Sequence, residues 1–281
     1  MEFSAGDVKK LRDETDAPLM ECKAALKEAE GDYTRAKEIL REKGKAAAAK
    51  RADRKTKAGV ALLAVSDDHK TAGGVVLESE TDFVAKNEEF IAIAQKIAEA
   101  FLATDPGSDP LAVKAGDTTV GGLVEEAIAK IRENIRVAKA VRLTTDASIA
   151  TYIHHDKTKA SAIELEGDAA TLLEVGHKLA IQSVAFPPEF VDKAEIPQDY
   201  IDHQVQIETK RAIEEGKKEE IAKNIAVGRV NKEIIKNVVL LEQPFYADLG
   251  KSVADYVSEQ AKAGNGSIKV RGFTLLTVGQ S

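Results

Sequence analysis

Aromatic residues are scarce in this sequence of 281 residues: tryptophan is absent, and all aromatic residues together account for only 5%. So few aromatic residues argue against an enzyme whose pocket binds flat substrates by stacking them on aromatic rings. Cysteine is nearly absent as well, and Cys22 alone cannot form a disulfide within the chain. The cysteine content therefore gives no sign of an oxidising compartment.

Long apolar runs are also missing, since no stretch approaches the roughly 20 residues that a membrane-spanning helix needs. The opening residues MEFSAGDVKK lack the charged and then apolar pattern of a secretion signal. A formal net charge of −7 argues against general binding to nucleic acid. We therefore expect a cytoplasmic protein that binds neither a membrane nor nucleic acid.

The motifs of several enzyme classes are absent too. The sequence has no Walker phosphate loop, no G-x-G-x-x-G after a strand and no nucleophile elbow. His154 and His155 are adjacent, so on a strand they would point to opposite faces and make poor joint metal ligands. The segment GNGS at 264–267 precedes no helix pattern and fits a turn. We expect no catalytic residues, no resident metal and no cofactor.

The remaining composition is that of a globular protein, with 43% hydrophobic and 31% charged residues, and the length allows two domains. Residues 1–44 predict three short helices. Ser4 and Asp7 form a capping-box pattern, and Asp32 can cap a third helix that ends before Gly44. None of these helices is long enough to be stable alone, so we expect them to pack together as one small domain.

A basic linker is predicted next, over residues 45–58. The stretch KGKAAAAKRADRKTK, which covers most of it, has seven basic residues, one acidic residue and no large apolar one. It is either a solvated, partly helical linker or a contact surface for a polyanion.

The spacing of apolar residues then changes from one typical of helices to the alternation typical of strands. Within residues 59–145, GVALLAV and TAGGVVLESE predict a hairpin about SDDHK. A helix with Phe90, Ala94 and Phe101 on one face follows, and TDPGSDP ends it. A second helix begins near Val120, and RVAKAVRL then alternates like a strand.

The same plan recurs in residues 146–281. SIATYIHH and KASAIELE predict a hairpin about DKTK, a helix from Leu172 stops at Pro187, and SIKVRGFTLLTV supplies a third strand. We therefore predict an α+β fold, with two similar antiparallel-sheet subdomains and covering helices after the three-helix domain. The similarity between the subdomains is one of pattern rather than of residue identity.

Residues 199–236 are charged, with only a thin apolar stripe. The pattern predicts two antiparallel helices joined near Gly216. A stripe that narrow packs a partner helix but not a core as well. We therefore expect a projecting coiled-coil hairpin that offers its surface to another chain. The stripe comprises Ile201, Val205, Glu208, Ala212, Ile221, Ile225, Gly228 and Ile235.

The stretch LESETDFVAKNEEF contains an unusual group of side chains. Glu78, Glu80 and Asp82 could share one face of a strand, either as a hard-cation site or as a solvated edge. Phe83 follows Asp82 directly. A helix cap at Thr81 or Asp82 with Phe83 in the core would explain the pair without a function. The alternative is an exposed aromatic anchor beside a carboxylate.

Four motifs in order give the sequence a specific resemblance. TDFVAKN after an apolar strand closely resembles the elongation factor Ts family, whose members are exchange factors for elongation factor Tu. The early stretch LRDETDAPLMECKAALKEAEGDYTRAKEILREKG resembles the ubiquitin-associated-type helical domain of that family. AFPPEF and LLEQPF follow in the right order, so the resemblance covers nearly the whole chain.

The resemblance implies a guanine nucleotide exchange factor in translation elongation that carries out no bond chemistry. Its partner would be elongation factor Tu, in the GDP-bound and nucleotide-free states, and a homodimer or a heterotetramer with this partner is compatible with it. The 199–236 segment matches the projecting coiled coil of the family.

The resemblance also implies roles for particular residues. Arg12 and Met20 match positions that touch the nucleotide-binding domain of the partner. Gln182 stands where the family often has a partner-contacting histidine, which puts that one contact in doubt. The residues that would approach the magnesium and phosphate region of the partner are Thr81, Asp82, Phe83 and Val84.

Two other classes of function stay open. One is a metal-dependent enzyme that uses Glu78, Glu80 and Asp82, although matching histidine or lysine partners are lacking. The other is a helical adaptor that binds peptides or nucleic acid through residues 1–57, which leaves the large second region without a role.

Overall fold

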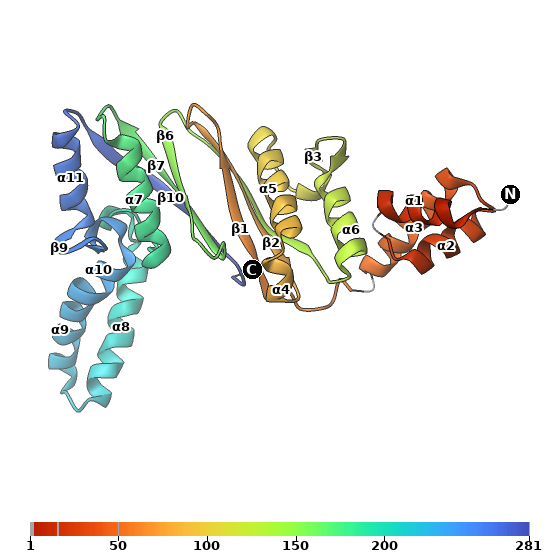
Figure 1. Ribbon diagram of the computed structural model, residues 1–281. Coiled ribbons are helices and arrows are strands. Elements are labelled where there is room, and N and C mark those ends of the chain that lie inside the picture. The colour runs from red at the N-terminus through yellow and green to blue at the C-terminus, as the bar shows by residue number, and fades with distance from the viewer. Residues whose placement is uncertain (1–2, 16, 50, 281) are drawn as a thin grey trace. The chain divides into compact units, whose positions relative to one another are not determined.

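The computed structural model describes residues 3–15, 17–49 and 51–280 (Figure 1). Helices at the N-terminal end are followed by two three-stranded sheets with helices packed on them, as expected for an α+β protein. Contacts divide the chain into two compact units. The first contains the residues up to Ala64, Gly73–Arg142 and those from Leu276 on, and the second contains Val65–Ala72 and Leu143–Leu275.

The N-terminal helices are α1 (Ala5–Thr15), α2 (Leu19–Glu28) and α3 (Tyr33–Ala49). Their small core includes Leu11 from α1 and Leu26 from α2, both fully buried. The predicted capping box is confirmed, because Ser4 Oγ accepts from the Asp7 amide at 3.2 Å and Asp7 Oδ2 accepts from the Ser4 amide at 2.8 Å. The predicted end before Gly44 is wrong, since α3 continues through the alanines of the basic stretch, which favour a helix.

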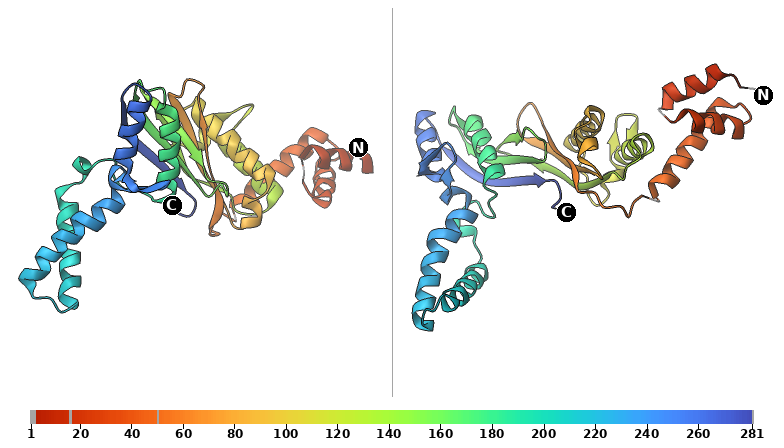
Figure 2. Two further views of the ribbon diagram at one scale, coloured as in Figure 1. Left: turned by 60° about the vertical axis from the view of Figure 1, so that its left-hand side comes forward. Right: turned by 60° about the horizontal axis from the view of Figure 1, so that its bottom comes forward.

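The sheet of the first unit has the order β1-β2-β5. Helix α5 approaches β2 closely at Gly73, where a side chain would collide with the α5 backbone at Ala98 and Phe101. The expected apolar face of α5 is confirmed, since Phe90, Ala94 and Phe101 are all buried. Figures 1 and 2 show α5 and α6 on the same face of this sheet. The elements are β1 (Ala58–Val65), β2 (Thr71–Ser79), α5 (Glu88–Ala103), η1 (Pro110–Ala112), β3 (Lys114–Ala115), β4 (Thr118–Thr119), α6 (Val120–Ile131) and β5 (Arg136–Thr144).

The sheet of the second unit has the order β10-β7-β6, so the second strand of the hairpin is again central. Strands β6 and β7 pair antiparallel, with Ala150 opposite Ile163. Helices α7 and α11 pack on this sheet around a core that contains Leu165, Leu179 and Val257. The elements are β6 (Ser148–Ile153), β7 (Lys159–Gly167), α7 (Leu172–Ala185), η2 (Lys193–Glu195), η4 (Leu240–Glu242), β8 (Pro244–Phe245), β9 (Asp248–Ser252), α11 (Val253–Ala263) and β10 (Ile268–Thr277).

The histidine pair differs from its prediction. Strand β6 ends at Ile153, so His154 and His155 lie in the turn that follows. Because the alternation of a strand no longer applies there, the two rings come together, with centroids 4.3 Å apart. The Tyr152 hydroxyl lies 3.0 Å from His154 Nδ1.

Helices α8 (Gln198–Glu214) and α9 (Glu219–Arg229) form a helical hairpin in the second unit. A π-helical turn, η3 (Val230–Ile234), continues α9 into α10 (Ile235–Val238). Gly216 adopts φ 87° at the turn. Its amide bonds to Ile213 O and the next amide bonds to Ala212 O, a Schellman ending that favours glycine.

The contact stripe of α9 also differs from its prediction. Ala222 and Ala226 are buried against α8, whereas Ile221 is 52% exposed. Small side chains let two helix backbones approach closely, and the larger isoleucine is left outside. The buried positions on α8 are Glu208 and Ala212, which agrees with the predicted stripe.

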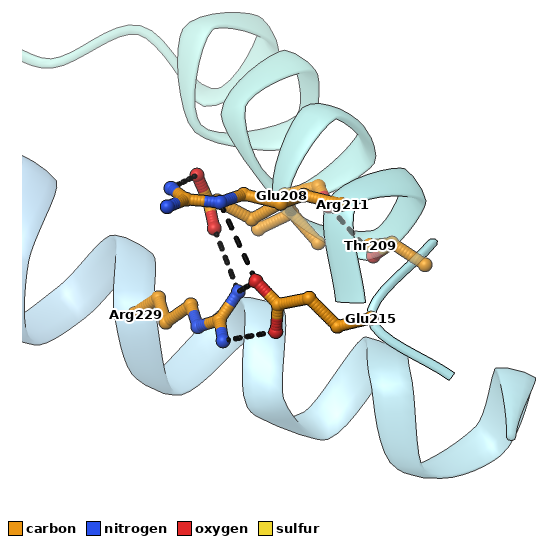
Figure 3. Close-up of polar contacts among 6 residues, drawn as sticks. Glu208, Thr209, Arg211, Glu215 and Arg229 are labelled. Carbon is orange, nitrogen blue, oxygen red and sulfur yellow. Dashed lines mark hydrogen bonds and ion pairs between the residues drawn. The ribbon is translucent and has the colours of Figure 1, made fainter. Parts of the chain in front are cut away.

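An ion-pair cluster joins the two helices of the hairpin (Figure 3). Glu208, only 8% exposed, lies with its Oε2 3.3 Å from Arg229 Nη1. Arg229 Nη2 also donates to Glu215 Oε2 at 2.7 Å, and Arg211 lies 3.4 Å from Glu208 Oε1. A buried carboxylate is costly unless it is paired, so Arg229 allows Glu208 to occupy the interface between the helices.

Among the helices of the described residues, none is both long and apolar enough to cross a membrane.

Candidate functional site

The TDFV motif forms a single helical turn at the end of the central strand of the first sheet. Strand β2 ends at Ser79, and α4 (Asp82–Ala85) begins three residues later. Thr81 is the N-cap, because its Oγ1 accepts from the Val84 amide at 3.4 Å. Asn87 then caps α5 by accepting from the Glu89 amide at 2.8 Å. Two caps in close succession turn the chain sharply and leave α4 as a separate corner.

Phe83 lies on the outside of this corner and is 83% exposed. Of the two explanations that the sequence left open, the helix cap is therefore present but the core phenylalanine is not. An aromatic ring contributes most to binding when a partner buries its large apolar surface. Its exposure on a capped turn makes Phe83 available to fill a pocket on another molecule.

Asp82 is also exposed, and Lys86 one turn later donates to its Oδ2 at 2.7 Å. This hydrogen bond and the positive charge of Lys86 hold the pKa of Asp82 below its ordinary value of 3.8. Asp82 is therefore a carboxylate at neutral pH. The corner presents an anion and an aromatic ring side by side.

Glu78 does not belong to a solvated edge, as the sequence allowed, because its side chain is fully buried. Arg136 Nη2 pairs with Glu78 Oε2 at 2.7 Å, and the Thr56 hydroxyl donates to the same oxygen at 2.8 Å. The Gly279 amide donates to Oε1 at 3.0 Å. Glu78 thus joins three distant parts of the first unit and serves its packing.

Glu80 has a different set of partners. Its Oε1 accepts from the Asn134 amide at 2.7 Å and lies 3.4 Å from Arg54 Nη1. Glu78, Glu80 and Asp82 therefore do not share one strand face, because β2 ends before Glu80. Over residues 3–15, 17–49 and 51–280, no three histidine, cysteine or acidic side chains come together to hold a metal ion.

The N-terminal candidates lie on the surface of the three-helix region. Arg12 is exposed in the last turn of α1. Met20 is 72% exposed near the start of α2, beside the half-exposed Leu19. These positions are accessible to another molecule, as a contact role requires. Their predicted contacts with a partner stay predictions.

Gln182 is fully buried within the second unit. Its Nε2 donates to Gln243 Oε1 at 2.9 Å and lies 3.2 Å from Pro244 O, and its Oε1 accepts from the Tyr246 amide at 2.8 Å. These bonds hold the β8–β9 segment against α7. The arrangement argues for an internal role, and a direct partner contact by Gln182 stays a prediction.

Sequence reasoning missed two residues that contact the motif. Lys86 could have been found, since lysine four positions after an aspartate on a helix commonly pairs with it. Glu133 could not, because it lies 52 positions from Thr81 and touches it only through the fold.

The comparisons with known proteins agree with the motif. A family model described as "Elongation factor TS" matches residues 80–280. The chain is 38% identical to elongation factor Ts of Chloroherpeton thalassium, with 99% of each chain covered. It is 37% identical to that of Clostridioides difficile, over 99% of this chain and 93% of the relative. It is 39% identical to that of Aquifex aeolicus, over 92% and 93%. The resemblance found in the sequence is confirmed.

Proposed function

The chain belongs to the elongation factor Ts family of translation elongation factors, and we propose that it promotes GDP release from elongation factor Tu so that GTP can bind. Such a protein needs no bond chemistry. It must bind the nucleotide-free GTPase more tightly than the GDP-bound GTPase. Thermodynamic linkage then requires that it weaken GDP binding by the same factor.

The single observation that carries the proposal is the 83% exposed Phe83 on a capped turn. An aromatic side chain that fills a pocket is a typical anchor of an interface, and its truncation often costs about 2 kcal/mol or more. Because Thr81 caps the start of α4 and the Lys86 amide donates to Asp82 O at 3.1 Å at its end, the ring is held ready before the partner arrives. Thr81 and Val84 complete the turn that presents it.

Asp82 supplies the perturbing part of the proposal. A carboxylate brought near the magnesium and phosphate shell of the partner repels the phosphates and competes for the ion. Phe83 anchors the corner while Asp82 acts by charge. The effect is modest at a wet interface, where salt and water screen the charge.

Further contacts extend the proposed interface. Arg12 and Met20 bind the nucleotide-binding domain of the partner, and the hairpin of α8 and α9 offers a second surface. Gln182 contributes by holding the β8–β9 segment in place. A homodimer or a heterotetramer with the partner, and a cytoplasmic location, belong to the same proposal.

The test replaces Phe83 by alanine and follows the release of fluorescent GDP from purified elongation factor Tu. Phe83→Ala should slow release at least about tenfold, which corresponds to about 1.4 kcal/mol. The matched control is Leu111→Ala, which removes another exposed apolar side chain of the first unit and should release GDP at the parent rate. Both variants should melt at the parent temperature, because neither side chain lies in the core.

Parent-like release by Phe83→Ala would contradict the anchoring role. A large drop in its melting temperature would show that the ring belongs to the core instead.

A further inference from the structure

We propose that Glu133 is a positioning residue for nucleotide exchange, which holds Thr81 and so fixes the turn that carries Asp82 and Phe83. The inference rests on the proposed function, and it concerns a residue outside the TDFV motif. Glu133 lies just after α6, in the short connection to β5.

The contact between Glu133 and Thr81 is bidentate. Glu133 Oε2 accepts from the Thr81 amide at 3.0 Å, and Oε1 accepts from the Thr81 hydroxyl at 2.6 Å. Hydrogen bonds to a charged acceptor are about twice as strong as those between neutral groups. One carboxylate therefore fixes both the backbone and the side chain of the residue that caps α4.

The bond from the Thr81 hydroxyl to Glu133 also fixes the orientation of the hydroxyl that caps α4. The Thr81 hydroxyl has one proton, and the bond to Glu133 uses it. The oxygen lone pairs are then free to accept from the Val84 amide, which lies 3.4 Å away. Without Glu133 the hydroxyl can rotate and donate elsewhere, and the capping bond competes with other orientations.

Glu133 itself is held in place by its neighbours. Arg132 ends α6 in the left-handed conformation, with φ 67°, and so turns the chain. The amide of the nearly fully buried Asn134 donates to Glu80 Oε1, and its side-chain Nδ2 donates to Ala52 O at 3.2 Å and Arg54 O at 2.7 Å. A carboxylate on a fixed loop can position its partner, whereas one on a mobile loop cannot.

Helix α4 needs such support because it is very short. It has four residues, and all of them are at least partly exposed. A single turn of helix is not stable in water by itself. Its order therefore depends on the cap, and a disordered turn would have to be ordered again when the partner binds, which reduces affinity.

The central experiment compares Glu133→Gln with the parent in the release of fluorescent GDP from elongation factor Tu. The amide group can accept only one of the two hydrogen bonds from Thr81. We expect kcat/KM for release to fall about tenfold, equal to about 1.4 kcal/mol, with the melting temperature nearly unchanged. The control is Glu126→Gln, the same substitution at an exposed position on α6, which should behave as the parent.

A double-mutant cycle separates positioning from the loss of a negative charge. Thr81→Val removes the hydroxyl and leaves the Glu133 charge in place. If Glu133 acts through Thr81, Thr81→Val should cause a similar loss, and the double variant should lose little more. Fully additive losses in the double variant would overturn the proposal.

Amide hydrogen exchange of the free chain gives a readout that needs no partner. In Glu133→Gln the amides of Thr81 and Val84 should exchange faster, while those of β2 and α5 keep the parent rates. Unchanged exchange at Thr81 and Val84 would overturn the inference. If Glu133→Gln fails to fold, Thr81→Val carries the test alone, and parent-like GDP release by it would overturn the inference.

The two proposals fail in different ways. If the parent itself releases no GDP, the proposed function is wrong, and hydrogen exchange still decides whether Glu133 orders the turn. If the parent is active and Glu133→Gln equals it, only the positioning role is wrong.

Discussion

Phe83 and Asp82 are neighbours in sequence, yet the fold gives them different surroundings. The ring of Phe83 faces solvent, while the carboxylate of Asp82 is paired with Lys86 at 2.7 Å. The pairing has a consequence for exchange, since Lys86 partly offsets the charge that Asp82 would bring to the partner. In the proposed mechanism, Asp82 would act fully on the magnesium site of the partner only if Lys86 turned toward phosphate or solvent.

The variant Asp82→Asn tests the charge mechanism, because asparagine is nearly isosteric and uncharged. Binding to nucleotide-free elongation factor Tu should survive, since Phe83 and the cap by Thr81 are intact. GDP release in millimolar magnesium should slow modestly, by a few-fold, and should match the parent in magnesium-free buffer. The measurement is a magnesium titration of the release rate, with Glu88→Gln as a control that removes an exposed charge from α5.

An equal deficit of Asp82→Asn with and without magnesium would count against this mechanism. Asp82 would then act by stabilising the turn, through its place in the first turn of α4 and its ion pair with Lys86.

The identity of the residues in the motif could be recognised from the sequence, but their environments could not. The capping pattern of Thr81 is local and so is visible in the sequence. The exposure of Phe83 and the burial of Glu78 depend on where β2 ends and on which segments, distant in the sequence, pack beside that end. Glu133 is the clearest case, because α5, α6 and the loops around them separate it from Thr81 in the sequence.

At the scale of the elements, hydrophobic period and turn residues were sufficient for most helices and for both hairpins. They failed where small residues decide the packing. On α9, Ala222 and Ala226 are buried while Ile221 is exposed, although Ile235 of the predicted stripe is buried in a cluster with Ile201 of α8. Helix α11 was not predicted either, although Ser252 and Asp255 form a capping box at its start.

The helical hairpin of α8 and α9 should depend on pH through its ion pairs. The hydrogen bond from Arg229 holds the pKa of Glu215 below its ordinary value of 4.5. A carboxyl with a lowered pKa in the folded state stabilises the fold above its unfolded pKa, and this contribution is lost as the pH falls through the folded pKa. The hairpin should therefore lose stability below about pH 4.5, as protonation of Glu215 proceeds.

The variant Arg229→Gln should make that dependence weaker. At neutral pH its hairpin amides should exchange hydrogen several-fold faster than those of the parent, because the buried Glu208 loses its main partner. Arg211→Gln is the matched control, since Arg211 is largely exposed and its contacts are longer, at 3.4 and 3.5 Å. Identical pH profiles for parent and Arg229→Gln would show that the ion pairs do not stabilise the hairpin.

At the scale of the whole molecule, the N-terminal helices have a core of their own and continue into the chain that supports the motif. Ala52 and Arg54 provide the carbonyl oxygens that accept from the Asn134 side chain. The point at which this region is removed should therefore matter. The domain boundaries predicted from the sequence stay predictions that truncation can test.

Removal of residues 1–50 should leave the remainder folded and weaken binding to elongation factor Tu about tenfold, through the loss of Arg12 and Met20. Removal of residues 1–54 should cost more, because the nearly buried Asn134 side chain then loses both acceptors. Thermal melts and binding titrations of the two truncated proteins measure the difference. If the protein that lacks residues 1–50 does not fold, the N-terminal region is not independent of the rest of the chain.

The proposed function requires the chain to accelerate GDP release by repeated cycles of binding to elongation factor Tu. The most direct measurement mixes a small amount of the chain with a large excess of elongation factor Tu carrying fluorescent GDP, in the presence of unlabelled nucleotide. An exchange factor that turns over should release all of the fluorescent GDP rapidly, at a rate proportional to the amount of chain added. Release that stops at one GDP per added chain, or that proceeds at the spontaneous rate, would contradict it.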